Sequence, residues 1–144
     1  MNLTANPLLT LLTMKTKVNK YNTNNMGKQI YSRSIDGVTV EWQELTQWWV
    51  LPSMSGITLN GKIYLRDAHK EQTDKKLRHE YTHVLQQLEL GYFIFLLFYC
   101  AMWFWGAITF QDAYESIKFE KESYANQKKV GYLKTRPKNA WKKY

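Results

Sequence analysis

The sequence predicts an α+β fold, in which a small antiparallel sheet comes first and a helical region follows. Two turn pairs, Asp36-Gly37 and Asn60-Gly61, each separate short runs of β-forming residues, which is typical of hairpins. Beyond the second pair, apolar residues recur at helical spacing instead. The chain has 144 residues, enough for one domain, and its 44% hydrophobic content excludes a disordered chain.

The N-terminal part is predicted to hold two hairpins behind a flexible arm. The arm covers residues 1–28 and ends in a polar, Asn-rich stretch. The first hairpin joins IYSRSI to VTVEW, although residues 41–50 also fit a short helix with its apolar residues on one side. Pro52 ends whichever element this is. The second hairpin ends in a strand over residues 62–65.

The central helix is predicted from its caps and its periodicity. Thr73 and Asp74 can cap a helix that runs from Lys75 to about Leu90, and Gly91 is a C-terminal stop. Apolar residues repeat along this segment at helical spacing, and the motif HEYTH lies on the same helix.

A later helix completes the predicted domain. Asp112 with Glu115 three residues on resembles a capping box for a helix. That helix, or a second one after a break near Ile117, carries the segment FEKESYANQKKV and stops at Gly131. We therefore place the domain at residues 29–131 and a basic tail at residues 132–144.

The net charge of +8 is concentrated at the two ends of the chain. Residues 1–34 carry five basic and no acidic side chains, and residues 127–144 carry seven basic and none acidic. The middle has eight basic and twelve acidic side chains, so the HEYTH region is not basic. Solvated basic ends are the common case, and a nucleic-acid partner is not expected.

The location of the protein is predicted from what the sequence lacks. Cys100 is the one cysteine, which excludes a disulfide within the chain and a cysteine-based metal site. No positive charge precedes the apolar stretch PLLTLLTM, so a signal peptide is not expected. We predict a cytoplasmic or virion-associated protein, with membrane association as the alternative.

The motif HEYTH carries the chemistry that the sequence suggests. His79 and His83 are four residues apart on a helix, so they project from one face at a separation that suits one Zn²⁺ ion. Glu80 then lies beside the metal, where it can take a proton from zinc-bound water. A di-iron site is disfavoured, because the remaining histidine, His69, belongs to no second Glu-x-x-His pair and is expected to be a solvated loop residue.

A third protein ligand has to come from elsewhere in the chain. The residues at 86 and 89 are Gln and Glu, so no third histidine follows at the spacing of the long HExxHxxGxxH motif. An acid on a later helix is the remaining common solution. The candidates are Asp112, Glu115, Glu120 and Glu122.

The segments HEYTHVLQQ and FEKESYAN together resemble the gluzincin class of zinc metallopeptidases, and in particular small, poorly characterised bacterial and phage proteins with an HExxHxxQ helix. The resemblance covers roughly residues 55–141 and implies a zincin-like fold. It assigns Glu120, which is followed by Ser123 in the family's Exx(S/A) pattern, as the third ligand, with Glu122 as the runner-up. Tyr124 stands where thermolysin-like members carry an acid that orients a ligand histidine.

The resemblance implies a zinc metalloendopeptidase that acts on peptides or proteins. Glu80 would activate the zinc-bound water as general base, and the predicted strand over residues 62–65 would pair with an extended substrate. Four side chains are candidates to stabilise the oxyanion: Tyr114, Tyr124, Tyr132 and Arg136. The alternative is a non-catalytic structural or interaction protein, virion- or membrane-associated, that retains a zincin-like fold.

Residues 91–110 form an uncharged, aromatic-rich run that decides whether such a site can form. As one helix they would be about 30 Å long, enough to span a bilayer. A spanning helix would separate His83 from Glu120, so the two could share a metal only if the run turns back, for instance near Gly106. Since Trp and Tyr prefer interfaces, we favour a helix that is buried or covered by a protein partner, with a membrane-surface element and a true span as alternatives.

Overall fold

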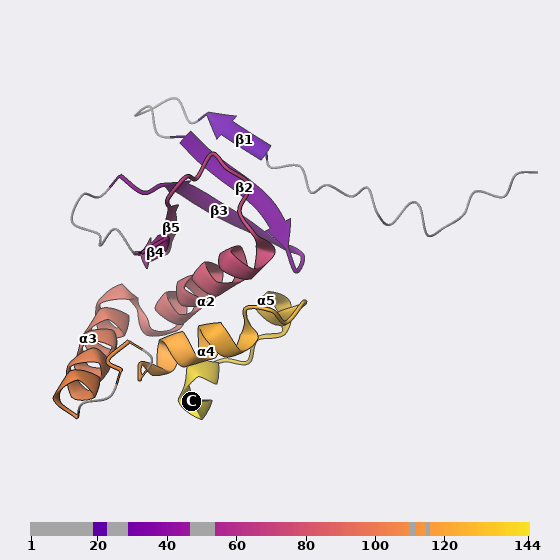
Figure 1. Ribbon diagram of the computed structural model, residues 1–144. Helices are drawn as coiled ribbons and strands as arrows, with labels where there is room; N and C mark the ends of the chain where they lie inside the picture. Colours follow the sequence, from indigo (N-terminus) through magenta and orange to yellow (C-terminus); the bar gives the residue numbers. More distant parts are fainter. Residues whose placement is uncertain (1–18, 23–28, 47–53, 110–111, 115) are drawn as a thin grey trace, which may run out of the picture.

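The structure is a computed structural model that describes residues 19–22, 29–46, 54–109, 112–114 and 116–144. Figure 1 shows the sheet on one side of helix α2 (Asp74–Leu90) and the C-terminal helices on the other side. The predicted arm at residues 1–28 lies outside the described residues apart from Asn19–Asn22, which form strand β1.

The sheet has five strands in the order β1-β2-β3-β5-β4. After β1 come β2 (Gln29–Ile35), β3 (Val38–Glu44), β4 (Gly56–Leu59) and β5 (Lys62–Leu65). The predicted α+β class is confirmed, but the sheet is mixed because β3 and β5 run parallel while the other neighbours are antiparallel. After β3 the chain first forms the outer strand β4. It then returns in β5, which lies between β4 and β3, antiparallel to β4 and parallel to β3.

This strand order corrects one prediction. Strand β5 is paired on both sides, so it cannot accept an added strand, and the edge position belongs to β4. The predicted strand VTVEW is confirmed and continues to Glu44, so the alternative helix does not begin at residue 41; the buried Trp42 of this strand donates a hydrogen bond to the Ala68 carbonyl at 3.0 Å. The remainder of the alternative helix, from residue 47, lies outside the described residues.

Both hairpin turns form as predicted. Asp36 and Gly37 have φ values of 54° and 78°, and Asn60 and Gly61 have φ values of 48° and 71°. Two successive residues with positive φ give the type I′ turn, whose twist matches that of the strands it joins.

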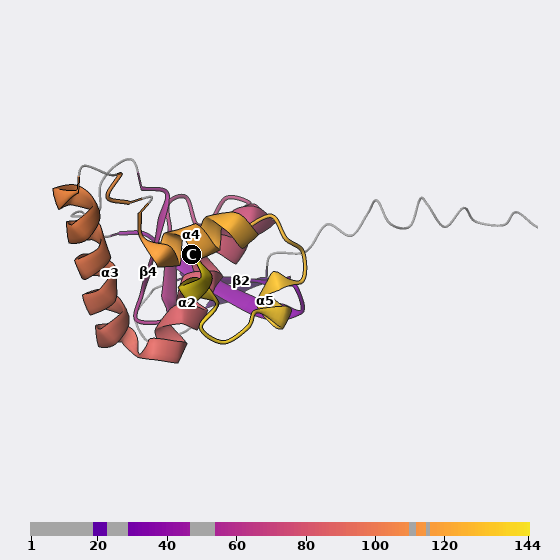
Figure 2. The same ribbon diagram turned by 90° about the horizontal axis from the view of Figure 1, so that it is seen from below.

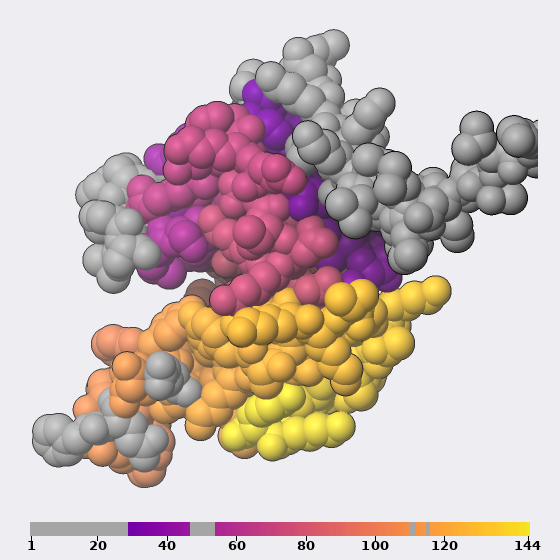
Figure 3. Space-filling model, turned by 45° about the vertical axis from the view of Figure 1, so that its right-hand side comes forward, coloured from indigo at the N-terminus to yellow at the C-terminus, as the bar shows by residue number. Residues whose placement is uncertain are grey.

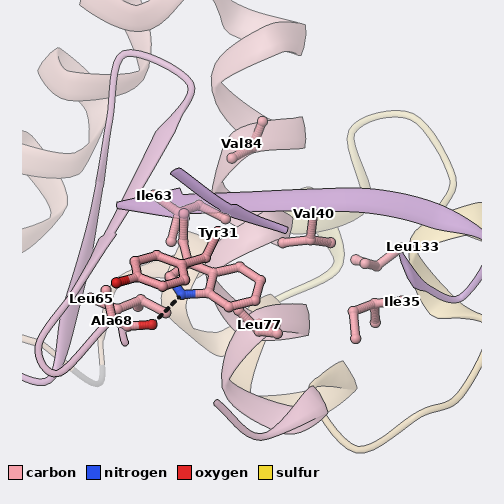
Figure 4. Packing of buried hydrophobic residues seen from close by; sticks show 10 residues of the cluster. Tyr31, Ile35, Val40, Ile63, Leu65, Ala68, Leu77, Val84 and Leu133 are labelled. Carbon is pink, nitrogen blue, oxygen red and sulfur yellow. Dashed lines mark hydrogen bonds between the residues drawn. The ribbon is translucent and has the colours of Figure 1, made fainter. Parts of the chain in front are cut away.

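The main hydrophobic core lies between the sheet and α2. Figure 4 shows its aromatic and aliphatic side chains, with Tyr31 and Trp42 stacked at a centroid distance of 6.0 Å. The buried members of this core are Tyr31, Ile35, Val40, Trp42, Ile63, Leu65, Ala68, Leu77, Val84 and Leu133. The core therefore holds the apolar face of α2 against the sheet and turns the HEYTH face toward the C-terminal helices.

The boundaries of α2 agree with the predicted caps. The hydroxyl of Thr73 accepts a hydrogen bond from the backbone N–H of Lys76, and Gly91 follows the last residue with a φ of 78°. The chain then turns by 113° into α3 (Tyr92–Ile108). The remaining elements are α4 (Lys118–Asn126), α5 (Tyr132–Thr135) and the short 3₁₀ helix η1 (Ala140–Lys143).

Of the two predicted starts of the later helix, the break near Ile117 is confirmed and the capping box at Asp112 is wrong. Helix α4 begins at Lys118, after an extended Ile117, and the Asp112 carboxylate instead accepts a hydrogen bond from the Tyr114 N–H within a turn. Glu115 lies outside the described residues. Ile117 is fully buried beside Phe119, so tertiary packing sets the helix start rather than the local capping signal.

The end of the chain belongs to the folded body. Helix α4 ends at Asn126, before the predicted stop at Gly131. Within residues 132–144, predicted as a basic tail, Tyr132, Leu133 and Trp141 are buried. In the space-filling view these C-terminal residues form a layer with α4 beneath the sheet and α2 (Figure 3).

Helix α3 is unbroken from Tyr92 to Ile108, so the chain turns back after this helix and not within it near Gly106 as predicted. The returning chain crosses it at Gly106, where an added Cβ would lie 2.9 Å from Ala113 Cα. Of the favoured alternatives for this run, burial within the chain is wrong, because only Phe95 and Gly106 of α3 are buried. Cover by a protein partner stays a prediction. Among the described residues no single helix is long and apolar enough to cross a membrane, although the bent pair of α2 and α3 meets that test by length and composition.

Candidate metal centre

Three side chains from two helices meet at the buried centre of the C-terminal half. His79 and His83 come from α2 and Glu120 comes from α4, and all three are buried. The two Nε2 atoms are 3.3 Å apart, and each lies 3.3 Å from a different carboxylate oxygen of Glu120. This group could hold a metal ion.

The packing of α4 explains why Glu120 reaches the histidines. Phe119 packs against Phe95 and Trp141 in a second hydrophobic core, separate from the one between the sheet and α2. Glu122 and Ser123 are also fully buried. These contacts fix the rotation of α4, so that Glu120 faces α2. Figures 1 and 2 both show the two helices side by side.

The charges within the group hold one another in place. Burial by itself would lower the pKa of His83, but the Glu120 carboxylate outweighs it and raises that pKa to about 9. Burial would raise the pKa of Glu120, yet the two histidines hold it well below its usual range. The pocket therefore stabilises a carboxylate next to a positive charge, which a proton or a metal ion can provide.

Two buried atoms of this group lack a hydrogen-bond partner within the described part of the chain. They are Nδ1 of His79 and Oε2 of Glu120. Buried polar atoms are nearly always satisfied, and exceptions call for an explanation such as a bound ion. For the carboxylate oxygen, a cation between the three donor atoms supplies that partner, so these residues fit a metal ion.

Gln86 orients His83 through Nδ1, the ring nitrogen that does not face Glu120. Its side-chain oxygen lies 2.8 Å from Nδ1 of His83, and its NH₂ group donates to the Phe119 carbonyl and to the Glu122 carboxylate. This contact leaves Nε2 of His83 facing Glu120. Sequence reasoning noted this glutamine within HExxHxxQ but missed its role, for which the i+3 spacing from His83 was the signal.

The runner-up ligand, Glu122, is not brought to the metal group. Its carboxylate accepts hydrogen bonds from the Arg136 guanidinium and the Tyr132 hydroxyl as well as from Gln86. Arg136 in turn pairs with Glu89 at 2.8 Å. Glu122 therefore supports the glutamine that holds His83, and the oxyanion candidates Tyr132 and Arg136 belong to this support.

Glu80 lies on the side of the group that faces strand β4. Its carboxylate accepts a hydrogen bond of 2.8 Å from the Thr58 hydroxyl. Gly56 allows the close approach, since an added Cβ there would lie 2.9 Å from a Glu80 oxygen. Thr58 was not predicted as a site residue, and the sequence pattern did not point to it, because the apolar Ile57 and Leu59 on either side predict the other face of the strand as the buried one.

Three tyrosines surround the group on its open side. The Tyr99 hydroxyl donates to Glu120 at 3.0 Å, and the Tyr124 ring lies 4.7 Å from the His79 ring. Burial and the Glu120 charge raise the pKa of Tyr99 and of Tyr114, so both remain hydrogen-bond donors at neutral pH. Of the predicted oxyanion candidates, Tyr114 and Tyr124 are thus the two near the histidines.

Two cavities open onto the group. The larger, about 640 Å³, is lined by His79, Glu80, Tyr114 and Tyr124 together with Trp103 from α3. The smaller, about 170 Å³, is lined by both histidines, Glu80 and Glu120, and it reaches strand β4 and helix α3. A volume of several hundred Å³ is in the range of ligand pockets.

One predicted ligand candidate, Asp112, and the third histidine lie outside the group. Asp112 belongs to the turn before α4, and the exposed His69 lies 3.8 Å from Glu44 at the far end of the sheet, as expected for a loop histidine. Comparison of the chain with protein-family models, with curated proteins and with solved structures finds no match.

Proposed function

We propose that this protein is a zinc-dependent metallopeptidase of the gluzincin type, with His79, His83 and Glu120 as ligands and Glu80 as general base. The observation that carries the proposal is the convergence of the three ligand atoms, from residues up to 41 positions apart, beside a buried glutamate. A helix with an ordinary polar face would not need a carboxylate from another helix between its histidines.

The donor set favours zinc. Two imidazole nitrogens and one carboxylate are typical of catalytic zinc sites, which keep a fourth position open. Zinc bonds of about 2.0–2.1 Å in a tetrahedron put ligand atoms about 3.4 Å apart, and the separations here are 3.3 Å. Bound zinc would supply a Lewis acid that polarises a peptide carbonyl and acidifies a water molecule.

Glu80 handles the proton in the proposed reaction. It takes a proton from the attacking water and passes it to the leaving amine as the peptide bond breaks. The Thr58 hydroxyl holds the carboxylate in one orientation toward the cavity. Tyr114 and Tyr124 are the donors proposed to stabilise the oxyanion, since both line the larger cavity.

Strand β4 is the proposed docking strand for the substrate. It is the last strand of the sheet, and four of its residues, together with Glu80, line the smaller cavity. Among the described strands none lies on the outer side of β4, and an extended peptide that pairs there would pass beside the metal ligands.

The test combines metal content with peptide hydrolysis. The parent protein should contain about one zinc per chain and should cleave members of a peptide library. Glu80→Gln should keep its zinc and lose hydrolysis by at least about a hundredfold. Glu71→Gln, an exposed glutamate outside the group, is the matched control and should keep both. Hydrolysis by Glu80→Gln at the parent rate would refute the mechanism.

A second set of variants tests the ligands. Glu120→Ala should lose zinc, and if it binds zinc like the parent then the proposed third ligand is wrong. Full zinc occupancy with no hydrolysis of any peptide would instead support a non-catalytic structural or interaction protein. The exposed apolar helix α3 is the observation that favours this second candidate.

A further inference from the structure

Helix α3 exposes apolar side chains around most of its circumference. Residues that face the protein form one narrow stripe: Tyr92, Phe95, Tyr99, Met102 and Gly106. The exposed large side chains are Phe93, Ile94, Leu96, Leu97, Phe98, Trp103, Phe104, Trp105 and Ile108. At about 100° per residue they cover an arc of roughly 220°, and Leu97 and Phe104 at its centre are 65% and 60% exposed.

The width of this arc points to lipid as the occupant. One partner helix covers a stripe of about 100°, so a second protein surface would leave much of the apolar arc in water. Acyl chains can surround a helix on every side that the protein leaves open. Figure 2 shows α3 standing at one side of the molecule, where a bilayer surface could reach it.

Basic residues beside α3 match an anionic lipid surface. Trp141 of η1 packs against Phe98 of α3, and Lys142 lies over the Trp141 ring. Lys142 and Lys143 are exposed, and neither forms an ion pair within the described part of the chain. Each lysine near a membrane surface adds about 1 kcal/mol of attraction to anionic lipid. The lysines would therefore meet head groups while α3 meets acyl chains.

The length of α3 indicates insertion rather than spanning. Its 17 residues make a helix of about 25 Å, shorter than the hydrocarbon core of about 30 Å. The bend of 113° to α2, whose polar face is buried in the protein, keeps the rest of the domain out of the bilayer.

We propose that α3 inserts into the surface layer of an anionic membrane and holds the metal-site cavity against it. Trp103 of α3 lines the larger cavity, and Phe95, Leu96 and Tyr99 line the smaller one, so the inserted helix is also a wall of the site. The substrates would then be polypeptide segments next to a membrane, a conclusion that rests on the proposed peptidase function.

Co-sedimentation with vesicles tests the insertion. The full chain should bind phosphatidylcholine vesicles that contain phosphatidylglycerol. The double substitution Leu97→Glu with Phe104→Glu should weaken binding by at least about tenfold, with zinc content and helical circular dichroism unchanged. Val130→Glu, at an exposed apolar residue outside α3, is the matched control and should bind like the parent.

The lysines and the oligomeric state give further outcomes. Lys142→Gln with Lys143→Gln should weaken binding to anionic vesicles by up to about thirtyfold, and should change binding to pure phosphatidylcholine little. The proposal is overturned if the parent binds no vesicles, or if the α3 double variant binds them equally well. A parent dimer that this variant makes monomeric, without vesicle binding, would assign the apolar arc to a second copy of the chain.

Hydrolysis on vesicles tests the substrate class. The same peptide library, free or tethered to the vesicles by a myristoyl chain, should be cleaved faster when tethered, and the α3 double variant should lose this preference. Equal rates for free and tethered peptides would refute the substrate assignment. If neither form is cleaved although vesicle binding holds, the peptidase function fails and the insertion stands.

Discussion

Helices α2 and α3 have the same length, 17 residues, and opposite relations to water. Seven of the nine buried residues of α2 are polar or charged, among them Arg78, His79, Glu80 and His83. Helix α3 has no charged residue and exposes nearly all of its apolar side chains. Each helix thus departs from the usual rule that apolar side chains are inside and polar ones outside.

The two departures are compensated in different ways. Buried polar groups are stabilised by partners inside the protein, and Arg78, Gln86 and Gln87 each have them. The exposed apolar surface of α3 is not covered by the described residues, and a surface of this kind marks an interaction site. Helix α2 therefore carries the proposed chemistry, and α3 carries the proposed location.

The largest effect is expected when one of the few contacts between α3 and the rest of the domain is removed. The ring centroids of Phe95 and Phe119 are 4.6 Å apart, and those of Phe95 and His83 are 6.3 Å apart. Phe95→Ala should lower the free energy of unfolding by about 3–5 kcal/mol, because it leaves a cavity in the second core. Urea unfolding measures this, and a loss below about 1 kcal/mol would show that α3 does not pack as described.

The second prediction concerns the buried charge of Arg78 on α2, which forms an ion pair with Asp36. Arg78 holds the pKa of Asp36, whose side chain is 1% exposed, at about 2 instead of 3.8. Because the pKa is lower in the folded state, the stabilisation is complete above about pH 4 and is lost as the pH falls toward 2. Asp36→Asn should therefore cost about 2 kcal/mol at pH 7.

Urea unfolding between pH 7 and pH 2 checks this dependence. The gap in unfolding free energy between the parent and Asp36→Asn should narrow below pH 4. Asparagine suits the positive φ of 54° at this turn, so the backbone is a constant in the comparison. A gap that stays the same down to pH 2 would contradict the ion pair.

A third prediction concerns the buried glutamines of α2. Gln86→Leu should weaken zinc affinity by about ten- to a hundredfold, because His83 loses the contact that orients it. Competition with a zinc-binding dye measures the affinity. Gln87→Leu is the matched control, since Gln87 is also buried but bonds Thr58 and Gly61 instead of a histidine. Equal losses in both variants would mean that orientation of His83 is not the cause.

The smallest effect is expected on the outer side of α3. Phe93 is 81% exposed and two residues from Phe95. Phe93→Ala should change the free energy of unfolding by no more than about 0.5 kcal/mol. Urea unfolding in the absence of lipid measures it, and a loss close to that of Phe95→Ala would mean that this side of α3 is covered in solution.

Sequence reasoning succeeded where the signal was local. The turns at Asp36-Gly37 and Asn60-Gly61 and the cap at Thr73 depend on neighbouring residues, and all three form as predicted. At the start of α4 the predicted break near Ile117 is confirmed, whereas the capping pattern at Asp112 is overridden by the burial of Ile117. Strand β5 forms as predicted, but its predicted edge position is wrong, because pairing with β3 places it inside the sheet.

By itself the sequence determined the α+β order of elements, the helix that carries HEYTH, and the pairing of two histidines on one face, because helix periodicity and turn chemistry act over a few residues. Only the tertiary structure decided that Glu120 rather than Glu122 faces the histidines, since the packing of Phe119 and the Arg136 ion pairs set the rotation of α4. It also decided that the apolar run forms one unbroken helix with its outer side exposed, after which the chain returns to α2. These outcomes depend on contacts between residues far apart in the chain, which no local pattern contains.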